Sequence, residues 1–209
     1  MYNNSYNIIL MRIINNKIIL QINMSLVELE KDLKLITDKN TIHSYLPLYD
    51  ELLCRKKFTC RNMLELGICY GGSIELWDKY FPNANITGLD ILADNKLPQS
   101  AFNENKVKLI SGDAYSPFLF TSLFRGKKFD FIIDDGPHTL ESQIKFLTMY
   151  SMLLEEDGIL IIEDVQNIHY LEILKENTHP NLKPYIKTFD LRSNKNRYDD
   201  IVFVIDKSN

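Results

Sequence analysis

The stretch FDFIIDDG, residues 129–136, is an almost continuous apolar run that ends in two acidic residues and a glycine. Four other short segments have the same form, with an acidic residue at or near the carboxyl end: NMLELG (62–67), NITGLD (85–90), VKLISGD (107–113) and ILIIEDV (159–165). Strands that are buried on both faces of a parallel sheet have this continuous apolar character. The five segments therefore predict the strands of a parallel sheet.

Segments with helical spacing lie before and between these runs. They are SLVELEKDLKLI (25–36), SYLPLYDELLCRK (44–56), GGSIELWDKYF (71–81), TLESQIKFLTMYSMLLEEDG (139–158) and VQNIHYLEILKEN (165–177). Ser25, with Glu28 three residues later, is expected to cap the first helix, and Gly158 is expected to stop the fourth. Two closing strands are expected at 185–192 and 200–206. This alternation predicts an α/β fold with a doubly wound, mostly parallel sheet and an N-terminal helical cap.

The chain has 209 residues, which is the size of one domain. We expect residues 25–209 to form that domain, with the helical cap at about 25–60 and the core at about 61–209. Residues 1–24 are expected to form an extension or a hairpin; alternatively, Met24 is the true start.

Composition excludes several classes of protein. The net charge is -4, which argues against a nucleic-acid partner bound through phosphate neutralisation. No uninterrupted apolar stretch is long enough to predict a transmembrane helix, so no membrane partner is expected. The three cysteines match no zinc spacing, and we interpret them as reduced thiols of a cytoplasmic protein.

The turn ELGICYGGS, residues 65–73, follows the first expected strand. Its glycines are spaced Gly-x-x-x-Gly-Gly, which differs from the Gly-x-Gly-x-x-Gly of dinucleotide-binding turns. Asp90 ends the second strand, where an acid can accept hydrogen bonds from two ribose hydroxyls. Ribose recognition without a pyrophosphate loop favours S-adenosylmethionine over NAD as the cofactor.

Three acids follow two strands that are expected to be neighbours: Asp135, Glu163 and Asp164. Neighbouring strands lie about 4.8 Å apart, so the three carboxylates would be crowded together. Like charges at such range are costly unless a cation neutralises them. A hard divalent cation such as Mg²⁺ is the natural occupant. The alternative is that some of these acids cap helices or pair with lysine.

At these residues the chain resembles a known family. ELGICYGGS (65–73), GLDI (88–91), SGDA (111–114) and FDFIIDDG (129–136) look like the motifs of class I S-adenosylmethionine-dependent methyltransferases, which have a Rossmann-like fold. More narrowly, the chain from about Thr37 to Val165 looks like the macrocin-type, metal-dependent sugar O-methyltransferases. The motifs that carry this narrower likeness are TDKNTIHSYLPLYDELL (37–53), LELGICYGGSIELWDKYFPNANITGLDI (64–91), DFIIDDGPH (130–138) and GILIIEDV (158–165).

The resemblance implies a role for each candidate residue. Asp135, Glu163 and Asp164 are expected to bind Mg²⁺ or another divalent cation, and His138 to be the general base. The expected cofactor-binding residues are Glu65, Gly67 and Ser73 at the methionine part, Gly71 in the same turn, Asp90 at the ribose, Asp113 at the adenine, and Asp134, His43 and Tyr45. Asp134 has a second interpretation, stabilising its strand end, and His43 and Tyr45 have another, in capping and packing.

The reaction implied is methyl transfer from S-adenosylmethionine to a hydroxyl of a sugar, in a nucleotide sugar, a glycan or a glycosylated small molecule. The cation lowers the pKa of the hydroxyl, and His138 removes its proton. A catechol- or caffeoyl-type O-methyltransferase is the main alternative, although the family pattern there ends the fifth strand in Asp-Asn and this chain has Glu163-Asp164. An NAD-dependent oxidoreductase and a non-catalytic cofactor-binding subunit are more remote alternatives. The family forms oligomers, and we expect a homo-oligomer here.

Overall fold

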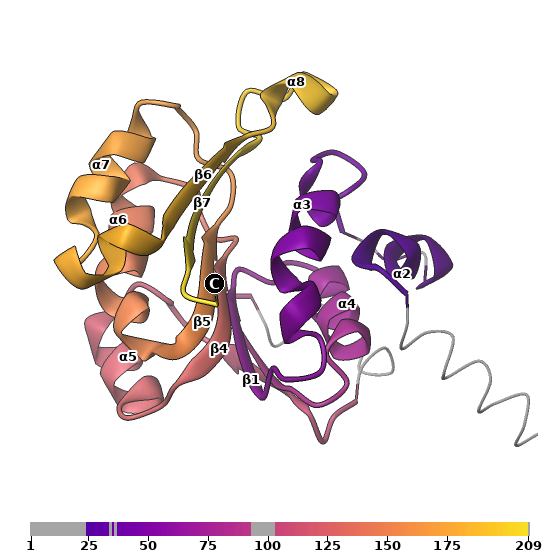
Figure 1. The fold of residues 1–209 in the computed structure, drawn as a ribbon. Helices are drawn as coiled ribbons and strands as arrows, with labels where there is room; N and C mark the ends of the chain where they lie inside the picture. Colours follow the sequence, from indigo (N-terminus) through magenta and orange to yellow (C-terminus); the bar gives the residue numbers. More distant parts are fainter. Residues whose placement is uncertain (1–23, 34, 36, 93–102, 209) are drawn as a thin grey trace, which may run out of the picture.

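The computed structural model describes residues 24–33, 35, 37–92 and 103–208. Its centre is a seven-stranded sheet in the order β3-β2-β1-β4-β5-β7-β6 (Figure 1). The strands are β1 (Asn62–Leu66), β2 (Asn85–Asp90), β3 (Val107–Ser111), β4 (Phe129–Asp134), β5 (Leu154–Ile162), β6 (Ile186–Asp190) and β7 (Ile201–Asp206).

The first five strands run parallel, and β7 is inserted antiparallel between β5 and β6. The expected neighbourhood of the fourth and fifth strands is confirmed, because β4 pairs with β5. The strand order reverses between β1 and β4, which are themselves paired. In open α/β sheets the ligand crevice lies at such a reversal, beyond the carboxyl ends of the strands.

Helices cover both faces of the sheet (Figure 1). On one side lie α2 (Leu26–Leu33), α3 (Tyr45–Leu53) and α4 (Gly72–Tyr80), and on the other lie α5 (Pro117–Phe124), α6 (Leu140–Tyr150) and α7 (Tyr170–Asn177). The short helical segments are η1 (Cys54–Lys56), η2 (Ser151–Leu153), η3 (Pro180–Tyr185) and α8 (Arg192–Lys195). The doubly wound α/β fold with preceding helices is thus confirmed.

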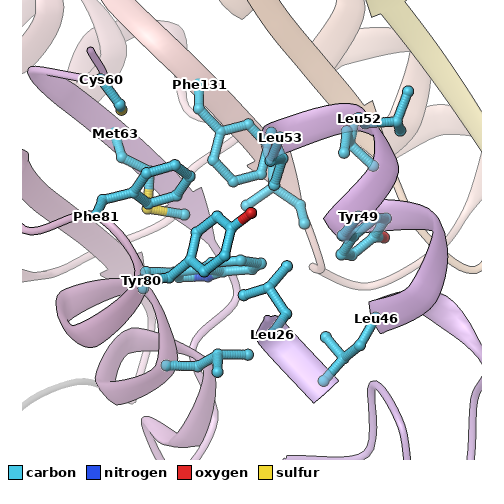
Figure 2. Close-up of a cluster of buried hydrophobic side chains, with 14 of the residues drawn as sticks. Leu26, Leu46, Tyr49, Leu52, Leu53, Cys60, Met63, Tyr80, Phe81 and Phe131 are labelled. Carbon is cyan, nitrogen blue, oxygen red and sulfur yellow. The ribbon is translucent and has the colours of Figure 1, made fainter. Parts of the chain in front are cut away.

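Alternate residues of each strand enter different cores because side chains alternate across a strand. In β4, Phe131 and Ile133 belong to the core beneath α2, α3 and α4, whereas Ile132 belongs to the core beneath α5, α6 and α7. Figure 2 shows the first core, where side chains of α2 and α3 meet Tyr80 and Phe81 beside Phe131. Both faces of the sheet are therefore buried beneath helices, and this burial accounts for the continuous apolar runs.

Local signals in the sequence start several helices. Ser25 and Glu28 form the expected capping box: the Glu28 amide donates to Ser25 Oγ at 3.2 Å, and the Ser25 amide donates to Glu28 Oε2 at 2.8 Å. Thr139 caps α6 by accepting from the Ser142 amide at 3.1 Å. This cap fixes the start of the helix that follows β4.

Several elements differ from expectation. The helix expected over 139–158 ends at Tyr150, because Leu154 already pairs with Phe129 in the sheet. The register then shifts, so that Phe131 pairs with Ile159, and β5 accommodates the polar residues before Gly158 in this irregularity. Helix α7 starts at Tyr170 rather than at Val165, and α5 was not expected at all.

The extension or hairpin expected for residues 1–24 lies outside the described residues, apart from Met24. Within the part of the chain that is described, no helix is both long enough and apolar enough to cross a bilayer.

Candidate active site

Unusual backbone conformations mark one end of the sheet. Among the described residues, four that are not glycine have a positive φ: Cys69, His138, Asp164 and Asn196. The first three lie on the turns that follow β1, β4 and β5. Such conformations cost free energy and cluster at functional sites. The backbone alone therefore points to the edge of the sheet that the strand-end acids predict.

A cleft of about 800 Å³ opens at this edge. Its lining includes Gly67, Cys69, Ser73, Asp90, Asp135 and His138. Asp90 shapes the turn after β1, because its Oδ2 accepts from the amides of Ile68 at 2.8 Å and Cys69 at 3.0 Å. Gly71, with a φ of 80°, is the N-cap of α4. The turn thus presents the start of a helix to the cleft, at a position where ligands bind in α/β folds.

Glu65 lies beneath this turn and is fully buried. Its Oε2 accepts from Ser73 Oγ at 3.0 Å and Trp77 Nε1 at 3.2 Å, whereas its Oε1 has no hydrogen-bond partner. Burial raises the pKa of Glu65 to about 7, although the positive charge of Lys39 opposes this shift. An orphaned buried carboxylate oxygen next to Ser73 is one that a cofactor's ammonium group can satisfy.

Asp134 and Asp113 are linked by one tyrosine. Tyr115 donates from its hydroxyl to Asp134 Oδ1 and from its amide to Asp113 Oδ1, the latter at 2.9 Å. Burial raises the pKa of Asp134 to about 7. Asp113 itself is exposed. Of the two interpretations of Asp134, this hydrogen bond supports the stabilisation of its strand end.

Asp135, His138 and Asp164 converge on one point. The His138 Nε2 atom lies 3.7 Å from Asp135 Oδ1 and 3.5 Å from Asp164 Oδ2. One ligand atom from each of the three residues lies within 4.8 Å of the others, which is a spacing that can hold a metal ion. The structure therefore brings together two of the three expected metal-binding acids and the expected base.

The side chain of Glu163 points toward the face of the sheet that α2, α3 and α4 cover. Its Oε1 accepts from Tyr49 Oη at 2.6 Å, and its Oε2 accepts from the ammonium group of Lys39. The same ammonium group donates to Asp135 Oδ2 at 2.5 Å and lies 3.8 Å from Glu65 Oε1. Burial alone would lower the pKa of Lys39, but these carboxylates raise it well above its ordinary value, so the side chain is charged.

His43 and Tyr45, at the start of α3, contact Asp164. Tyr45 Oη donates to Asp164 Oδ1 at 2.5 Å, and His43 Nδ1 lies 3.3 Å from the same oxygen and 2.6 Å from Asp200 Oδ1. The two rings stack, with centroids 4.9 Å apart. Both residues are buried and are not in the lining of the cleft. Their contacts orient a candidate metal ligand and show no direct route to a cofactor.

A second cleft, of about 520 Å³, lies on the far side of His138. Gln166, Tyr170, Tyr198 and Asp199 are among the residues that line it. Tyr198 Oη donates to Gln166 Oε1 at 2.9 Å, and Asp199 Oδ1 is buried without a hydrogen-bond partner. Among the described residues, His138 is the one that lines both clefts.

The chain is similar in sequence and in structure to several known methyltransferases. No protein-family model matches the chain. The 8-demethyl-8-(2-methoxy-alpha-L-rhamnosyl)-tetracenomycin-C 3'-O-methyltransferase of Streptomyces olivaceus is 30% identical over 132 residues, which are 59% of this chain and 32% of that protein. The mycinamicin VI 2''-O-methyltransferase of Micromonospora griseorubida is 28% identical over 138 residues, which are 62% of this chain and 33% of that protein.

Among solved structures, the MycE methyltransferase from the mycinamycin biosynthetic pathway, in complex with Mg, SAH and mycinamycin VI, matches with a TM-score of 0.58 and 29% identity. The match covers 68% of this chain and 37% of that one. The chain has the class I methyltransferase fold. The resemblance to methyltransferases of the macrocin type is also confirmed, since the demethylmacrocin O-methyltransferase of Streptomyces fradiae is 29% identical over 139 residues. The chain spans about a third of the length of these curated relatives.

Sequence reasoning on this methyltransferase fold missed Lys39, Tyr49, Tyr115 and Asp200. Lys39 lies within TDKNTIHSYLPLYDELL, but nothing in its spacing shows that it contacts Asp135, 96 residues away. Asp200 comes just before a strand, whereas the sequence pattern pointed to acids at the carboxyl ends of strands. Because β7 runs antiparallel, its first residues lie at the same edge as the carboxyl ends of the parallel strands.

Proposed function

We propose that this chain carries a divalent-cation-dependent O-methyltransferase activity that moves a methyl group from S-adenosylmethionine to a hydroxyl of a sugar. The observation that carries this proposal is the position of His138 in the wall of both clefts, with Asp135 and Asp164 beside its ring. One cleft suits the methyl donor and the other the acceptor, and a proton acceptor lies between them. The relatives named above support the reaction class, since each is named as an O-methyltransferase.

The first cleft has the features that a cofactor of this kind requires. Gly67 and the start of α4 let the backbone approach a ligand closely. Asp90 lines the cleft, and its Oδ1 accepts only from the Leu92 amide while its Oδ2 accepts from the Ile68 and Cys69 amides, so Oδ1 keeps a lone pair for a ribose hydroxyl. Glu65 Oε1 lies 3.8 Å from the Lys39 ammonium group but has no hydrogen-bond partner, so it offers an acceptor for the amino group of the methionine part. We therefore assign Glu65, Gly67, Gly71, Ser73 and Asp90 to cofactor binding.

The residues at the edge also fit a divalent cation. Asp135 and Asp164 offer carboxylate oxygens, which hard cations such as Mg²⁺ prefer, and this choice of ligands leaves the His138 ring nitrogen free to accept a proton. Glu163 supplies a further carboxylate one residue from Asp164, where Lys39 now neutralises it. When bound, the cation would polarise the acceptor hydroxyl and lower its pKa.

His138 performs the proton transfer in this mechanism. A sugar hydroxyl that enters from the second cleft donates its proton to Nε2, and its oxygen forms a bond to the methyl carbon as the carbon–sulfur bond of the donor breaks. Asp135 and Asp164 stabilise the imidazolium that results. Gln166, Tyr198 and the orphaned oxygen of Asp199 provide hydrogen-bonding groups for the remaining sugar hydroxyls. The protein thus contributes position and charge.

The test is a transfer assay with methyl-labelled S-adenosylmethionine, offered a panel of nucleotide sugars, glycosylated polyketides and catechols. Each acceptor is assayed with Mg²⁺ and with EDTA. We expect label on a sugar hydroxyl only when Mg²⁺ is present. Label on catechols alone would favour the catechol-type alternative, and label on no acceptor, together with binding of NAD rather than S-adenosylmethionine, would refute the proposal.

Two further expectations stay predictions. The free cysteines Cys54, Cys60 and Cys69 support a reducing, cytoplasmic location. A homo-oligomer remains an expectation from the family resemblance.

A further inference from the structure

Lys39 is the feature that the proposed mechanism leaves unexplained. Its side chain is 1% exposed, and its ammonium group contacts Asp135 and Glu163 and lies 3.8 Å from Glu65. A lysine this deeply buried is rare unless it is paired, because removing an ammonium ion from water costs several kcal/mol. A buried positive charge therefore lies where the candidate metal ligands Asp135 and Glu163 meet.

The charges around Lys39 are not balanced by it alone. Asp135, Glu163 and Asp164 bring three carboxyl groups to this edge, and the ammonium group of Lys39 brings one positive charge. A divalent cation would attract the same oxygens more strongly, because the Coulomb attraction scales with the charge. The oxygens that Lys39 occupies are Asp135 Oδ2 and Glu163 Oε2. Both side chains are among the three acids expected to bind metal.

We propose that Lys39 is an internal counter-ion of the site, which holds Asp135 and Glu163 in competition with a divalent cation. In the metal-free protein it neutralises the acids and allows the edge of the sheet to pack. For Glu163 to join Asp135 and Asp164 on a cation, Lys39 has to give up Glu163 Oε2, because Oε1 already accepts from Tyr49 Oη. This inference rests on the proposed metal dependence. It assigns to Lys39 the role of positioning two candidate metal ligands.

The segment that carries Lys39 links this competition to the first cleft. Thr37, Asp38, Thr41 and Ile42 line that cleft. The segment is held as a turn by hydrogen bonds from the Ile42 and His43 amides to the Asp38 carbonyl, at 3.0 and 2.9 Å. The segment that holds Lys39 is therefore also part of the wall of the cofactor cleft.

The experiment measures Mn²⁺ binding directly, by isothermal calorimetry and by the electron paramagnetic resonance of free Mn²⁺, without any turnover. The variants are Lys39→Met, which removes the competing charge, and Lys39→Arg, which keeps it. The matched control is Lys56→Met, because Lys56 is also buried, with 3% of its side chain exposed, and pairs with Asp157 away from the site. Thermal unfolding of each protein is recorded in EDTA and in Mn²⁺.

We expect Lys39→Met to bind Mn²⁺ at least tenfold more tightly than the wild type, to melt at a lower temperature in EDTA, and to gain more stability from Mn²⁺. Lys39→Arg should keep an affinity within threefold of the wild type. Lys56→Met should lose thermal stability without a change in Mn²⁺ affinity. If Lys39→Met does not fold in EDTA, Lys39→Gln, which retains a hydrogen-bond donor for Glu163, has the same expected direction.

An affinity for Mn²⁺ that is unchanged or weaker in Lys39→Met and Lys39→Gln would overturn the competition while leaving the proposed function intact. Absence of Mn²⁺ binding in the wild type and in every variant would instead remove the metal dependence on which both proposals rest. Binding in Lys39→Met but not in the wild type would support the competition and contradict metal-dependent catalysis by the wild type under those conditions. The three results are distinguishable.

Discussion

Gly67 and Asp135 approach each other so closely that a Cβ atom on Gly67 would lie 1.9 Å from the Asp135 carbonyl oxygen. The amide of Asp135 also donates to the Leu66 carbonyl at 2.8 Å, so the two turns after β1 and β4 are tied at the reversal of strand order. Gly67 has a φ of 80°, which only glycine adopts at little cost. This close approach places Asp135 at the floor of the first cleft.

Gly67→Ala should therefore disrupt the site. The methyl group would collide with backbone that cannot move freely, and the positive φ adds strain, so we expect a loss of stability on the order of 3 kcal/mol. Binding of S-adenosylmethionine should fall with it. Urea unfolding and cofactor titration measure both effects. The control is Gly126→Ala, where φ is 74° but no atom lies within 4 Å of the new Cβ; its cost should be about 1 kcal/mol. Equal losses in the two variants would show that the approach to Asp135 is unimportant.

His138→Asn should separate proton transfer from binding. Asparagine tolerates the positive φ of 58° at this position better than most residues, so the backbone should be preserved. We expect turnover to fall by about 100-fold or more, the usual contribution of a general base, with cofactor affinity within twofold of the wild type. Steady-state rates and calorimetry supply the two numbers. The control is His179→Asn, in a histidine whose Nδ1 accepts from the Asn181 amide, and this variant should retain full turnover. Wild-type rates in His138→Asn would remove this histidine from the mechanism.

The cysteines report occupancy of the first cleft. Cys69 is exposed and lines that cleft, Cys54 is exposed elsewhere, and Cys60 is buried. Burial raises the pKa of Cys60 to about 12, so its thiol should be unreactive. We expect S-adenosylhomocysteine to slow alkylation of Cys69 by iodoacetamide at least fivefold and to leave Cys54 unaffected, as followed by peptide mass spectrometry. Equal protection of both thiols, or of neither, would place the cofactor away from the turn after β1.

Asp78 should give the protein a defined dependence on pH. Its Oδ1 accepts from Lys106 at 2.9 Å and its Oδ2 accepts from the Asn103 amide at 3.2 Å. Burial alone would raise the pKa of Asp78, but its hydrogen bonds and charge pairing with Lys106 and Lys79 outweigh burial and lower it. The unfolded chain therefore binds more protons than the folded one near pH 4, so the stabilisation is present above that pH and is lost as the pH falls below it.

Asp78→Asn should consequently cost about 1–2 kcal/mol at pH 7, and the difference from wild type should shrink as the pH falls below about 4. Urea unfolding between pH 3 and pH 7 measures this. Glu172→Gln, which removes an exposed pair with Lys175, should change stability by less than about 0.5 kcal/mol across the range. A difference for Asp78→Asn that is constant with pH would contradict the assignment.

The sheet was predicted well because a strand that is buried on both faces needs a continuous run of apolar residues, which is visible in the sequence. Each of the five apolar runs is a strand, and the acids at their ends mark the edge where the clefts lie. Helix α5 was missed although Ser116 and Pro117 form a helix start, with Ser116 Oγ accepting from the Leu119 amide at 3.4 Å. The early start of β5 was missed because its acidic residues continue the pattern of the preceding helix.

The sequence predicted the strand-end acids, the glycine turn with Ser73, and His138, but not how the acidic side chains meet the helical cap. Whether two acids meet depends on rotamers and on which cation lies between them, and neither is visible in spacing. Glu163 shows this: it follows β5 as expected, yet its side chain contacts Tyr49 and Lys39 from the helical cap. Such contacts join residues more than a hundred positions apart. Spacing along the chain carries no record of them.

Within the described part of the chain the two clefts share His138 alone, so under the proposed function the methyl donor and the acceptor would be recognised by separate sets of residues. Substitutions at Gln166, Tyr170, Tyr198 or Asp199 can alter which molecule is modified while the methyl supply stays as it is. A scaffold divided in this way can diversify its products one side chain at a time. It would also be a practical starting point for directed evolution toward new glycosides.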